Sequence, residues 1–400
     1  MLNNNEYLNK LYQSDKPLII YKTDTGFDIF TDFSHKYIIT KKNIKNFLNS
    51  QTQNKSLNHK SLNCYVGFFG YKLLCENIGI KLPKQKSNNF YSGIFYKPLT
   101  KISFNKKITI KSYKKNFRSI KSNKNNEYSD EKKFDLNLTL KQYSKLFKEF
   151  SENIKQGKTY QIKIAQTYSK KGNLNAVKLF WKLMKMNESP ESFLIRDKDY
   201  NIISCSPETL LIKKNNIIKT KPIAGTLKKK KNITLKKALS FFRLNEKETK
   251  EHNMIVDMER NDLSRICKTG SVKIDKLKQV EEYRDLFHYV TTIKGYVKNK
   301  VSNHDIISAL MPGGSVIGCP KINTIQLLNS KETNERNIYT GSFGIIHSNG
   351  DMRFNIMIRT LLNFKNLINL SVASGVILGS TAKKEYNENY IKAKSLLDLF

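Results

Sequence analysis

Short hydrophobic runs alternate with polar stretches from about residue 17 to residue 95. The runs PLIIYK, YVGFFGYKLL and SGIFYK have the spacing of antiparallel strands with one wetted face. In the stretch 101–135, the first half predicts lysine-decorated edge strands, and the second half, rich in Ser, Asn and Lys, predicts a connection. The N-terminal third is therefore expected to be rich in sheet.

The hydrophobic period changes to that of an amphipathic helix after about residue 140. The apolar positions with this spacing are Leu140, Tyr143, Leu146, Phe147 and Phe150. Gly157 predicts the end of this helix, and a strand is expected directly after it at 159–169. Further strands are predicted at 193–206, 209–223, 336–346 and 367–378. Further helices are predicted near 235–260, 303–310, 319–330 and 383–399.

Composition identifies a globular chain with a strong positive charge. In 400 residues, 39% are hydrophobic, and 71 Lys plus Arg exceed 34 Asp plus Glu, which gives a net charge of +37. The excess is mostly Lys and is spread along the whole chain, whereas Arg, which reads base edges better, is scarce. This pattern favours a solvated lysine-coated surface and argues against a nucleic-acid partner.

The five cysteines stand singly, with no CxxC spacing, so the sequence suggests neither a zinc site nor a disulfide framework. The N-terminal residues contain no apolar signal region, and no apolar run of about 18 residues occurs. We therefore expect a cytoplasmic protein without a membrane partner.

Two pairs of carboxylates recur with helical spacing. Glu248 and Glu251 are three residues apart, and so are Glu385 and Glu388, which Lys392 follows on the same helical stripe. Two such pairs on two helices could enclose Mg²⁺, which prefers oxygen ligands and keeps waters or substrate oxygens. Surface ion pairing with nearby lysines is the structural alternative for each pair.

Two turns rich in Pro and Gly and one histidine complete the candidate chemistry. The segment 312–320 predicts a tight loop before an amphipathic helix, whose backbone N–H groups could face an anion. The segment KPIAGT, 221–226, predicts a turn after a strand. His288 could move protons near pH 7, although a single histidine among aromatic residues is commonly structural. Neither GxxxxGK[ST] nor GxGxxG occurs, so nucleotide binding is unsupported.

Taken in order, KPIAGT, EHNMIVDMERNDLSRI, the His288 segment, PGGSVIGCPK, YTGSFG, IRT and the final E-x-x-E-x-x-x-K resemble the chorismate-utilising enzymes. This family includes component I of aminodeoxychorismate synthase and of anthranilate synthase. The resemblance implies an α/β (α+β) fold of two large stacked antiparallel sheets with helices outside. It also implies an N-terminal sheet-rich region, 1–135, and a chorismate-binding catalytic region, 136–400, within one interleaved unit.

The resemblance assigns a Mg²⁺ site to the carboxylate pairs. Glu251 and Glu388 correspond to direct metal ligands, and Glu248 and Glu385 correspond to carboxylates that support them through water. The non-catalytic alternative, a basic nucleic-acid-binding protein that has kept the fold, would be expected to have lost these residues or Lys392. All are present.

The resemblance also assigns the groups that contact chorismate. Contacts to its carboxylates are implied for Lys392, Arg359, Tyr339 and the backbone around Gly375. The turn PIAGT adds three substrate-facing residues: Ala224, Gly225 and Thr226.

Four further residues match positions next to the reacting atoms. Glu208 corresponds to the general acid near the leaving hydroxyl, and a desolvated carboxyl with a raised pKa suits that task. His288 corresponds to the histidine linked to pyruvate elimination, and Ser315 to a Thr or Ser near the site. Gln161 stands where isochorismate-forming relatives carry a water-activating lysine. An amide is no base near neutral pH, so ammonia becomes the expected nucleophile.

Two products remain open. PGGS, MIVDMERNDL, GSVKI and GSFG, together with the absence of an LLES-like segment, favour aminodeoxychorismate synthase and folate synthesis. Ala224 favours anthranilate synthase and tryptophan synthesis, because many aminodeoxychorismate synthases carry a lysine there. We take aminodeoxychorismate as the expected product and anthranilate as the alternative. No glutaminase nucleophile is recognisable in the sequence, so a separate glutamine amidotransferase subunit is expected to supply ammonia.

Overall fold

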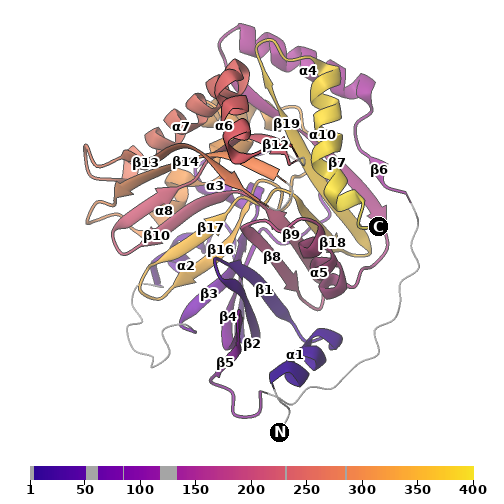
Figure 1. Cartoon of the computed structure of the whole chain (residues 1–400), viewed down its shortest axis with the longest axis vertical. Helices are drawn as coiled ribbons and strands as arrows, with labels where there is room; N and C mark the ends of the chain where they lie inside the picture. Colours follow the sequence, from indigo (N-terminus) through magenta and orange to yellow (C-terminus); the bar gives the residue numbers. More distant parts are fainter. Residues whose placement is uncertain (1–3, 51–61, 84, 118–132, 230–231, 284–285) are drawn as a thin grey trace.

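The computed structural model describes residues 4–50, 62–83, 85–117, 133–229, 232–283 and 286–400 (Figure 1). The side chains of residues 224, 226, 228, 247, 248 and 286 lie outside this description. Within the described ranges, no helix is both long and apolar enough to cross a lipid bilayer.

The strands form a large antiparallel network with two arms that meet at β4 (Gly93–Phe104). On one edge β4 pairs with β2, and on the other it pairs with β3 and with β5 (Ile108–Ser112). In the first arm, consecutive strands pair in the order β2 (Gly26–Ile38), β1 (Leu18–Thr23), β8 (Glu191–Arg196), β9 (Tyr200–Ser206), β18 (Thr360–Phe364), β19 (Leu367–Ile377) and β7 (Gln161–Lys171). The short strands β6 (Asp135–Leu136) and β15 (Gly318–Cys319) also pair with β7.

The second arm continues from β3 in the opposite direction. Its strands pair in the order β3 (Cys64–Phe69), β16 (Ser342–His347), β17 (Met352–Asn355), β10 (Thr209–Lys214), β11 (Ile217–Thr220) and β14 (Leu286–Tyr296). Two further strands, β12 (Ile223–Lys228) and β13 (Lys273–Glu282), pair with β14.

A shared apolar core holds the two arms face to face. Residues of β1, β8, β9 and β18 from the first arm pack there against residues of β3 and β16 from the second. Phe193 and Phe343 stack across this interface with ring centroids 3.8 Å apart. The predicted fold class, two stacked antiparallel sheets with helices outside, is therefore confirmed.

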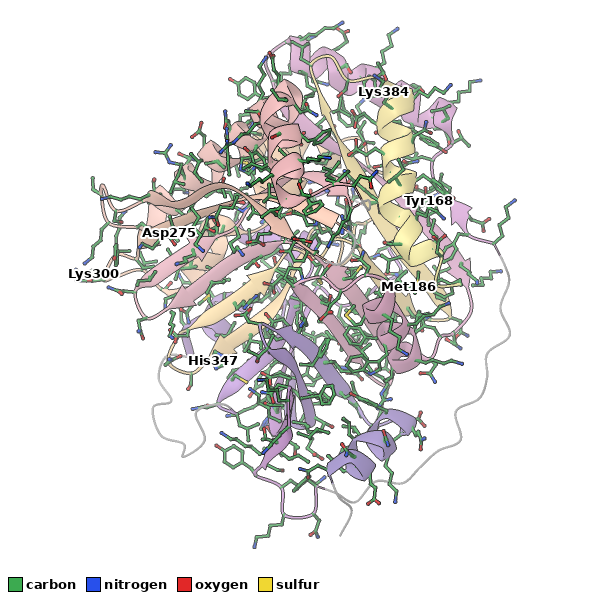
Figure 2. The ribbon with its side chains drawn as sticks, viewed as in Figure 1. Tyr168, Met186, Asp275, Lys300, His347 and Lys384 are labelled. Atoms are coloured by element: carbon green, nitrogen blue, oxygen red, sulfur yellow. The ribbon has the colours of Figure 1, made fainter. Side chains whose placement is uncertain are left out.

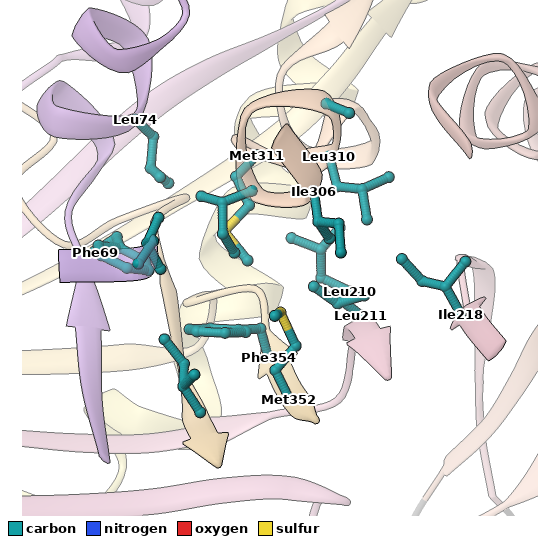
Figure 3. Packing of buried hydrophobic residues seen from close by; sticks show 14 of the residues in the cluster. Phe69, Leu74, Leu210, Leu211, Ile218, Ile306, Leu310, Met311, Met352 and Phe354 are labelled. Carbon is teal, nitrogen blue, oxygen red and sulfur yellow. The ribbon is translucent and has the colours of Figure 1, made fainter. Parts of the chain in front are cut away.

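Helices cover the outer faces of both arms. The first arm is covered by α1 (Asn4–Gln13), α5 (Ala176–Met186) and α10 (Ala382–Leu397). The second arm is covered by α2 (Ile44–Ser50), α3 (Tyr71–Asn77), α7 (Glu246–Ile266) and α8 (Asn303–Leu310). Figure 3 shows Ile306 and Leu310 of α8 with Leu210 and Phe354 of the sheet in the same buried cluster. In addition, α6 (Leu235–Leu244) packs on β14, and α4 (Leu140–Lys155) and α9 (Lys321–Asn329) lie near β7.

The predicted helix after residue 140 is confirmed as α4. Thr139 begins it with a capping box, in which its hydroxyl accepts from the Gln142 amide while the Gln142 side chain accepts from the Thr139 amide. Gly157 follows the helix with a φ of +71°, a left-handed conformation that glycine adopts without a steric penalty. The strand that was expected directly afterwards is β7.

Several sequence expectations were wrong in detail. The run YVGFFGYKLL is strand β3 only as far as Phe69, and α3 begins at Tyr71, with Gly70 in extended conformation at the N-cap position. The segment KPIAGT is a turn only at its start, since a bulged strand begins at Ile223. The predicted strand 336–346 begins only at Ser342. Most of the expected connection before residue 135 lies outside the described residues.

Lysines are distributed over separate parts of the surface. Lys300 follows β14 and Lys384 lies on α10, and these two exposed side chains stand far apart (Figure 2). This distribution agrees with the expectation of a lysine-coated surface.

Candidate active site

The paired strands β7 and β19 form the floor of the candidate site. Their antiparallel register places Lys163 opposite Gly375 and Gln161 opposite Ile377. Because side chains alternate between the faces of a strand, Gln161 and Lys163 point to the same face. Helix α7 brings Glu251 to this face.

Glu251 accepts two hydrogen bonds at one oxygen. Its Oε1 lies 2.6 Å from Nε2 of Gln161 and 3.2 Å from Nζ of Lys163. Burial raises the pKa of Glu251, but the charge of Lys163 and the bond from Gln161 outweigh it, so the pKa lies below its ordinary value. Glu251 is therefore an ionised carboxylate in a mostly buried position, which rules out simple surface ion pairing for this residue.

A second carboxylate and a second ammonium face the same region from α10. Nζ of Lys392 lies 2.7 Å from Oε1 of Glu388 and donates at 3.1 Å to the backbone carbonyl of Ala373. Burial raises the pKa of Glu388, but the charge and hydrogen bond of Lys392 outweigh this effect, so the pKa lies below its ordinary value. Glu251 and Glu388 also repel each other electrostatically, so the two predicted metal ligands are neighbours.

Of the two carboxylates that were predicted to support the metal ligands, the structure describes the side chain of only one. Glu385 is 2% exposed, and its backbone carbonyl accepts a 2.9 Å hydrogen bond from Oγ of Ser374 in β19. Its position on α10, one turn before Glu388, agrees with the predicted second pair. The side chain of Glu248 lies outside the described residues, as do those of Ala224 and Thr226.

Glu208 lies in the connection between β9 and β10 and is 5% exposed. Burial raises its pKa to about 7, although a hydrogen bond from Ser315, the charges of Lys163 and Arg359, and the backbone of Ile223 all act to lower it. Oγ of Ser315 donates to Oε1 of Glu208 at 2.7 Å. Glu208 is therefore a carboxyl that can hold a proton near neutral pH, as the resemblance predicts for a general acid.

Arg359 and His288 belong to the same buried neighbourhood. Nη1 of Arg359 is buried without a hydrogen-bond partner, and its guanidinium interacts electrostatically with Glu208 and His288. A buried donor left unpaired in this way is ready to bind an anionic ligand. Burial and the charge of Arg359 lower the pKa of His288 to about 3, and its backbone contact with Gly225 only partly opposes them. His288 is thus a neutral imidazole at physiological pH.

Tyr339 is buried and lies against the guanidinium of Arg336, whose central carbon is 5.7 Å from the centre of the Tyr339 ring. Arg336 in turn donates at 3.1 Å to the backbone carbonyl of Lys163. Burial raises the pKa of the Tyr339 phenol, so it is a neutral hydroxyl. These contacts connect Tyr339 to β7 through Arg336.

The described carboxylates fit part of a magnesium site. Ionised Glu251 and Glu388 offer the oxygen ligands that Mg²⁺ prefers. No three His, Cys, Asp or Glu side chains within the described ranges converge on one point, so waters and substrate oxygens would have to complete the coordination. Gly375 keeps the floor open, because a Cβ there would lie 2.8 Å from both Nζ of Lys163 and Nε2 of Gln161.

The sequence analysis missed Lys163. This side chain reaches the centre of the site, where it interacts with Glu251, Glu388 and Glu208. The available signal was its spacing of two residues from Gln161 within a predicted strand, which places both side chains on one face.

A family model matches nearly the whole chain, and curated relatives match about two thirds of it. The family model of the chorismate binding enzymes matches residues 9–398. An anthranilate synthase component I-like protein of Synechocystis is 34% identical over 288 residues, which are 70% of this chain and 59% of that protein. Aminodeoxychorismate synthase component 1 of Bacillus subtilis is also 34% identical, over 252 residues, 63% of this chain and 54% of that protein.

Solved structures share the fold. Anthranilate synthase component I of Streptococcus pneumoniae superposes with a TM-score of 0.77 at 24% identity, covering 95% of this chain and 90% of that one. The menaquinone-specific isochorismate synthase of Escherichia coli gives 0.78 at 17% identity, covering 98% and 90%. The matches to these two curated sequences span between half and two thirds of their lengths. Because the family model covers residues 9–398, the protein belongs to the chorismate-binding enzyme family.

Proposed function

We propose that this protein catalyses the Mg²⁺-dependent amination of chorismate, with 4-amino-4-deoxychorismate as the product. Relatives that are named for two different aminating reactions match at the same 34% identity, which supports amination without separating the products.

Gln161 is the observation that carries the choice of ammonia over water. A reaction with water needs a base near the attacked ring carbon, and the amide of Gln161 has no proton affinity near neutral pH. Its Nε2 is instead committed as a donor to Glu251 at 2.6 Å. Neutral ammonia is a much stronger nucleophile than neutral water and needs no such base to attack.

Arg359 and Lys392 are proposed to hold the two carboxylates of chorismate. Arg359 has a buried donor without a partner, and Lys392 reaches the backbone of Ala373 beside Gly375. Pre-positioned cations bind the substrate dianion and fix the ring without reorganisation during the reaction.

Glu208 is proposed to protonate the ring hydroxyl as it leaves. Its pKa of about 7 means that a large fraction carries a proton at neutral pH, and Ser315 fixes one carboxyl oxygen so that the other can face the substrate. Mg²⁺, when held by Glu251 and Glu388 with Glu248 and Glu385 in the supporting roles that the resemblance implies, would neutralise substrate charge and orient a carboxylate.

The second candidate product is anthranilate, and Ala224 favours it. Residue 224 has no nucleophilic group that could add to the ring, so direct attack of ammonia at C2 followed by loss of pyruvate is the simpler route. Neutral His288 would then accept the proton of the elimination step, which a protonated imidazole could not do.

A glutamine amidotransferase subunit is the proposed source of ammonia, and the cytoplasm is the proposed location. The component I names of the relatives support the second subunit, since a first component implies a second.

Product identification tests the proposal. The purified protein is incubated with chorismate, Mg²⁺ and ammonium, with and without added aminodeoxychorismate lyase. The products are separated by chromatography and identified by mass spectrometry. We expect 4-aminobenzoate only when the lyase is present. Anthranilate formed without the lyase would establish the second candidate. Turnover that requires no ammonium would contradict both.

A further inference from the structure

The side chain of Lys163 places a positive charge beside the carboxylates that the resemblance assigns to a metal ion. Its side chain is 12% exposed, and Nζ lies 3.2 Å from Oε1 of Glu251. The same ammonium interacts electrostatically with Glu388, the second expected ligand. Lys163 is thus shared by the two carboxylates that were assigned to Mg²⁺.

Each of the two expected metal ligands already has an ammonium group beside it. Glu251 and Glu388 carry two negative charges, and Lys163 and Lys392 carry two positive ones at 3.2 and 2.7 Å from them. Oε1 of Glu251 accepts from both Gln161 and Lys163, so its lone pairs are occupied. A divalent cation that used this oxygen would have to break at least one of these bonds and would repel the nearby ammonium.

The strand pair β7 and β19 leaves room for the Lys163 side chain, and a neighbouring arginine holds the Lys163 backbone in place. Gly375 lies opposite Lys163 in the register, and even a methyl group there would lie 2.8 Å from Nζ. Arg336 holds the backbone of Lys163 from behind through its 3.1 Å hydrogen bond. The ammonium therefore fits into this position without displacing the floor of the site.

We propose that the ammonium of Lys163 is a resident counter-cation of Glu251 and Glu388, which a divalent cation displaces on binding, so that Lys163 weakens the affinity of the site for the metal. This inference rests on the proposed metal site. It adds that the affinity is set by competition with a side chain of the protein itself.

Isothermal titration calorimetry of the metal-free full chain with Mg²⁺, in the absence of chorismate, tests the inference. We expect Lys163→Met to lower the Mg²⁺ dissociation constant by about ten-fold or more, because one repelling charge beside the ion is removed. Lys163→Gln, which keeps a donor for Glu251 but no charge, should do the same and guards against misfolding of the first variant. Lys171→Met is the matched control, since it removes an exposed charge from the other end of the same strand.

The outcomes separate this inference from the proposed function. Unchanged or weaker Mg²⁺ binding in folded Lys163→Met and Lys163→Gln would overturn the role of Lys163, while chorismate turnover with ammonium would still support amination. Tightening by Lys171→Met to the same degree would also overturn it, because the effect would then be one of net charge. If the wild-type protein and both Lys163 variants all fail to bind Mg²⁺ and Mn²⁺, both this inference and the metal part of the proposed function fail.

Discussion

Ser315 donates a 2.7 Å hydrogen bond to Glu208, and the two residues are 107 positions apart in the chain. The bond joins the Gly-Gly-Ser turn after α8 to the connection between β9 and β10. It favours the ionised form of Glu208, whose pKa burial nevertheless raises to about 7. The balance of these two effects sets how much of the general acid is protonated at neutral pH.

Replacing Ser315 with alanine should shift the pH profile. Loss of the hydrogen bond removes a stabilising contact of the ionised carboxylate, so the pKa of Glu208 rises and its acid form persists to higher pH. The descending limb of kcat/KM, expected near pH 7 in the wild type, should then move upwards. The profile is measured at constant free ammonia, with Ser264→Ala on the exposed face of α7 as the control. An unmoved limb would remove Glu208 from the proton transfer.

Glu208→Gln keeps the shape of the side chain but removes the transferable proton. We expect kcat to fall by about 100-fold to 10 000-fold, the usual contribution of general acid catalysis. Chorismate binding should change little, because Arg359 and Lys392 are retained. Equilibrium binding of chorismate together with steady-state kinetics checks this, and a loss of binding with kcat preserved would contradict the assignment.

Gly375→Ala should impair the site more than the fold. The new methyl would meet the flexible ends of Lys163 and Gln161 at 2.8 Å. Because these ends can move, the free energy of unfolding should change by less than about 1 kcal/mol. Activity should fall because both donors leave Glu251. In contrast, Gly67→Ala places its methyl 2.0 Å from the Ile94 carbonyl oxygen in the paired strand and should cost on the order of 3 kcal/mol. Denaturant titration of both variants, with activity assays of Gly375→Ala, distinguishes the two effects.

Glu251→Gln and Glu388→Gln should both abolish Mg²⁺-dependent turnover in folded protein, but with different costs in stability. Glu251→Gln removes the carboxylate that is hydrogen-bonded to Lys163, whose side chain is only 12% exposed, and should cost about 2–4 kcal/mol of unfolding free energy. The side chains of Glu388 and Lys392 are 44% and 35% exposed, so loss of that pair should cost less than about 1 kcal/mol. Urea titration of both variants measures their free energies of unfolding and shows which substitution costs more stability. Full activity in either one would contradict the metal site.

Sequence patterns predicted the elements whose signals are local. The periodicity and stop signal of α4 lie within one segment, and 303–310 matches α8. Strand β13 was missed, because it is mostly polar and exposed and lacks a buried alternating face. A strand of this kind is defined by its partner, here β14, and not by its own composition.

The residues of the candidate site also fall into those with a local sequence signal and those that only tertiary contacts bring together. The resemblance assigned roles to Glu208, Glu251, Arg359 and Glu388, because each lies in a recognisable motif, and the structure places these residues in one neighbourhood. The contact between Lys163 and Glu251 joins positions 88 residues apart and depends on how α7 lies against β7, which no local pattern encodes.

The most direct test of the central claim labels the two competing nucleophiles. The protein is given chorismate, Mg²⁺ and nitrogen-15 ammonium in oxygen-18 water, and the mass of each product is determined. Amination predicts that the product carries the heavy nitrogen and no heavy oxygen on its ring. Heavy oxygen on the ring, with no incorporation of nitrogen, would show that water is the nucleophile and would contradict the proposed function.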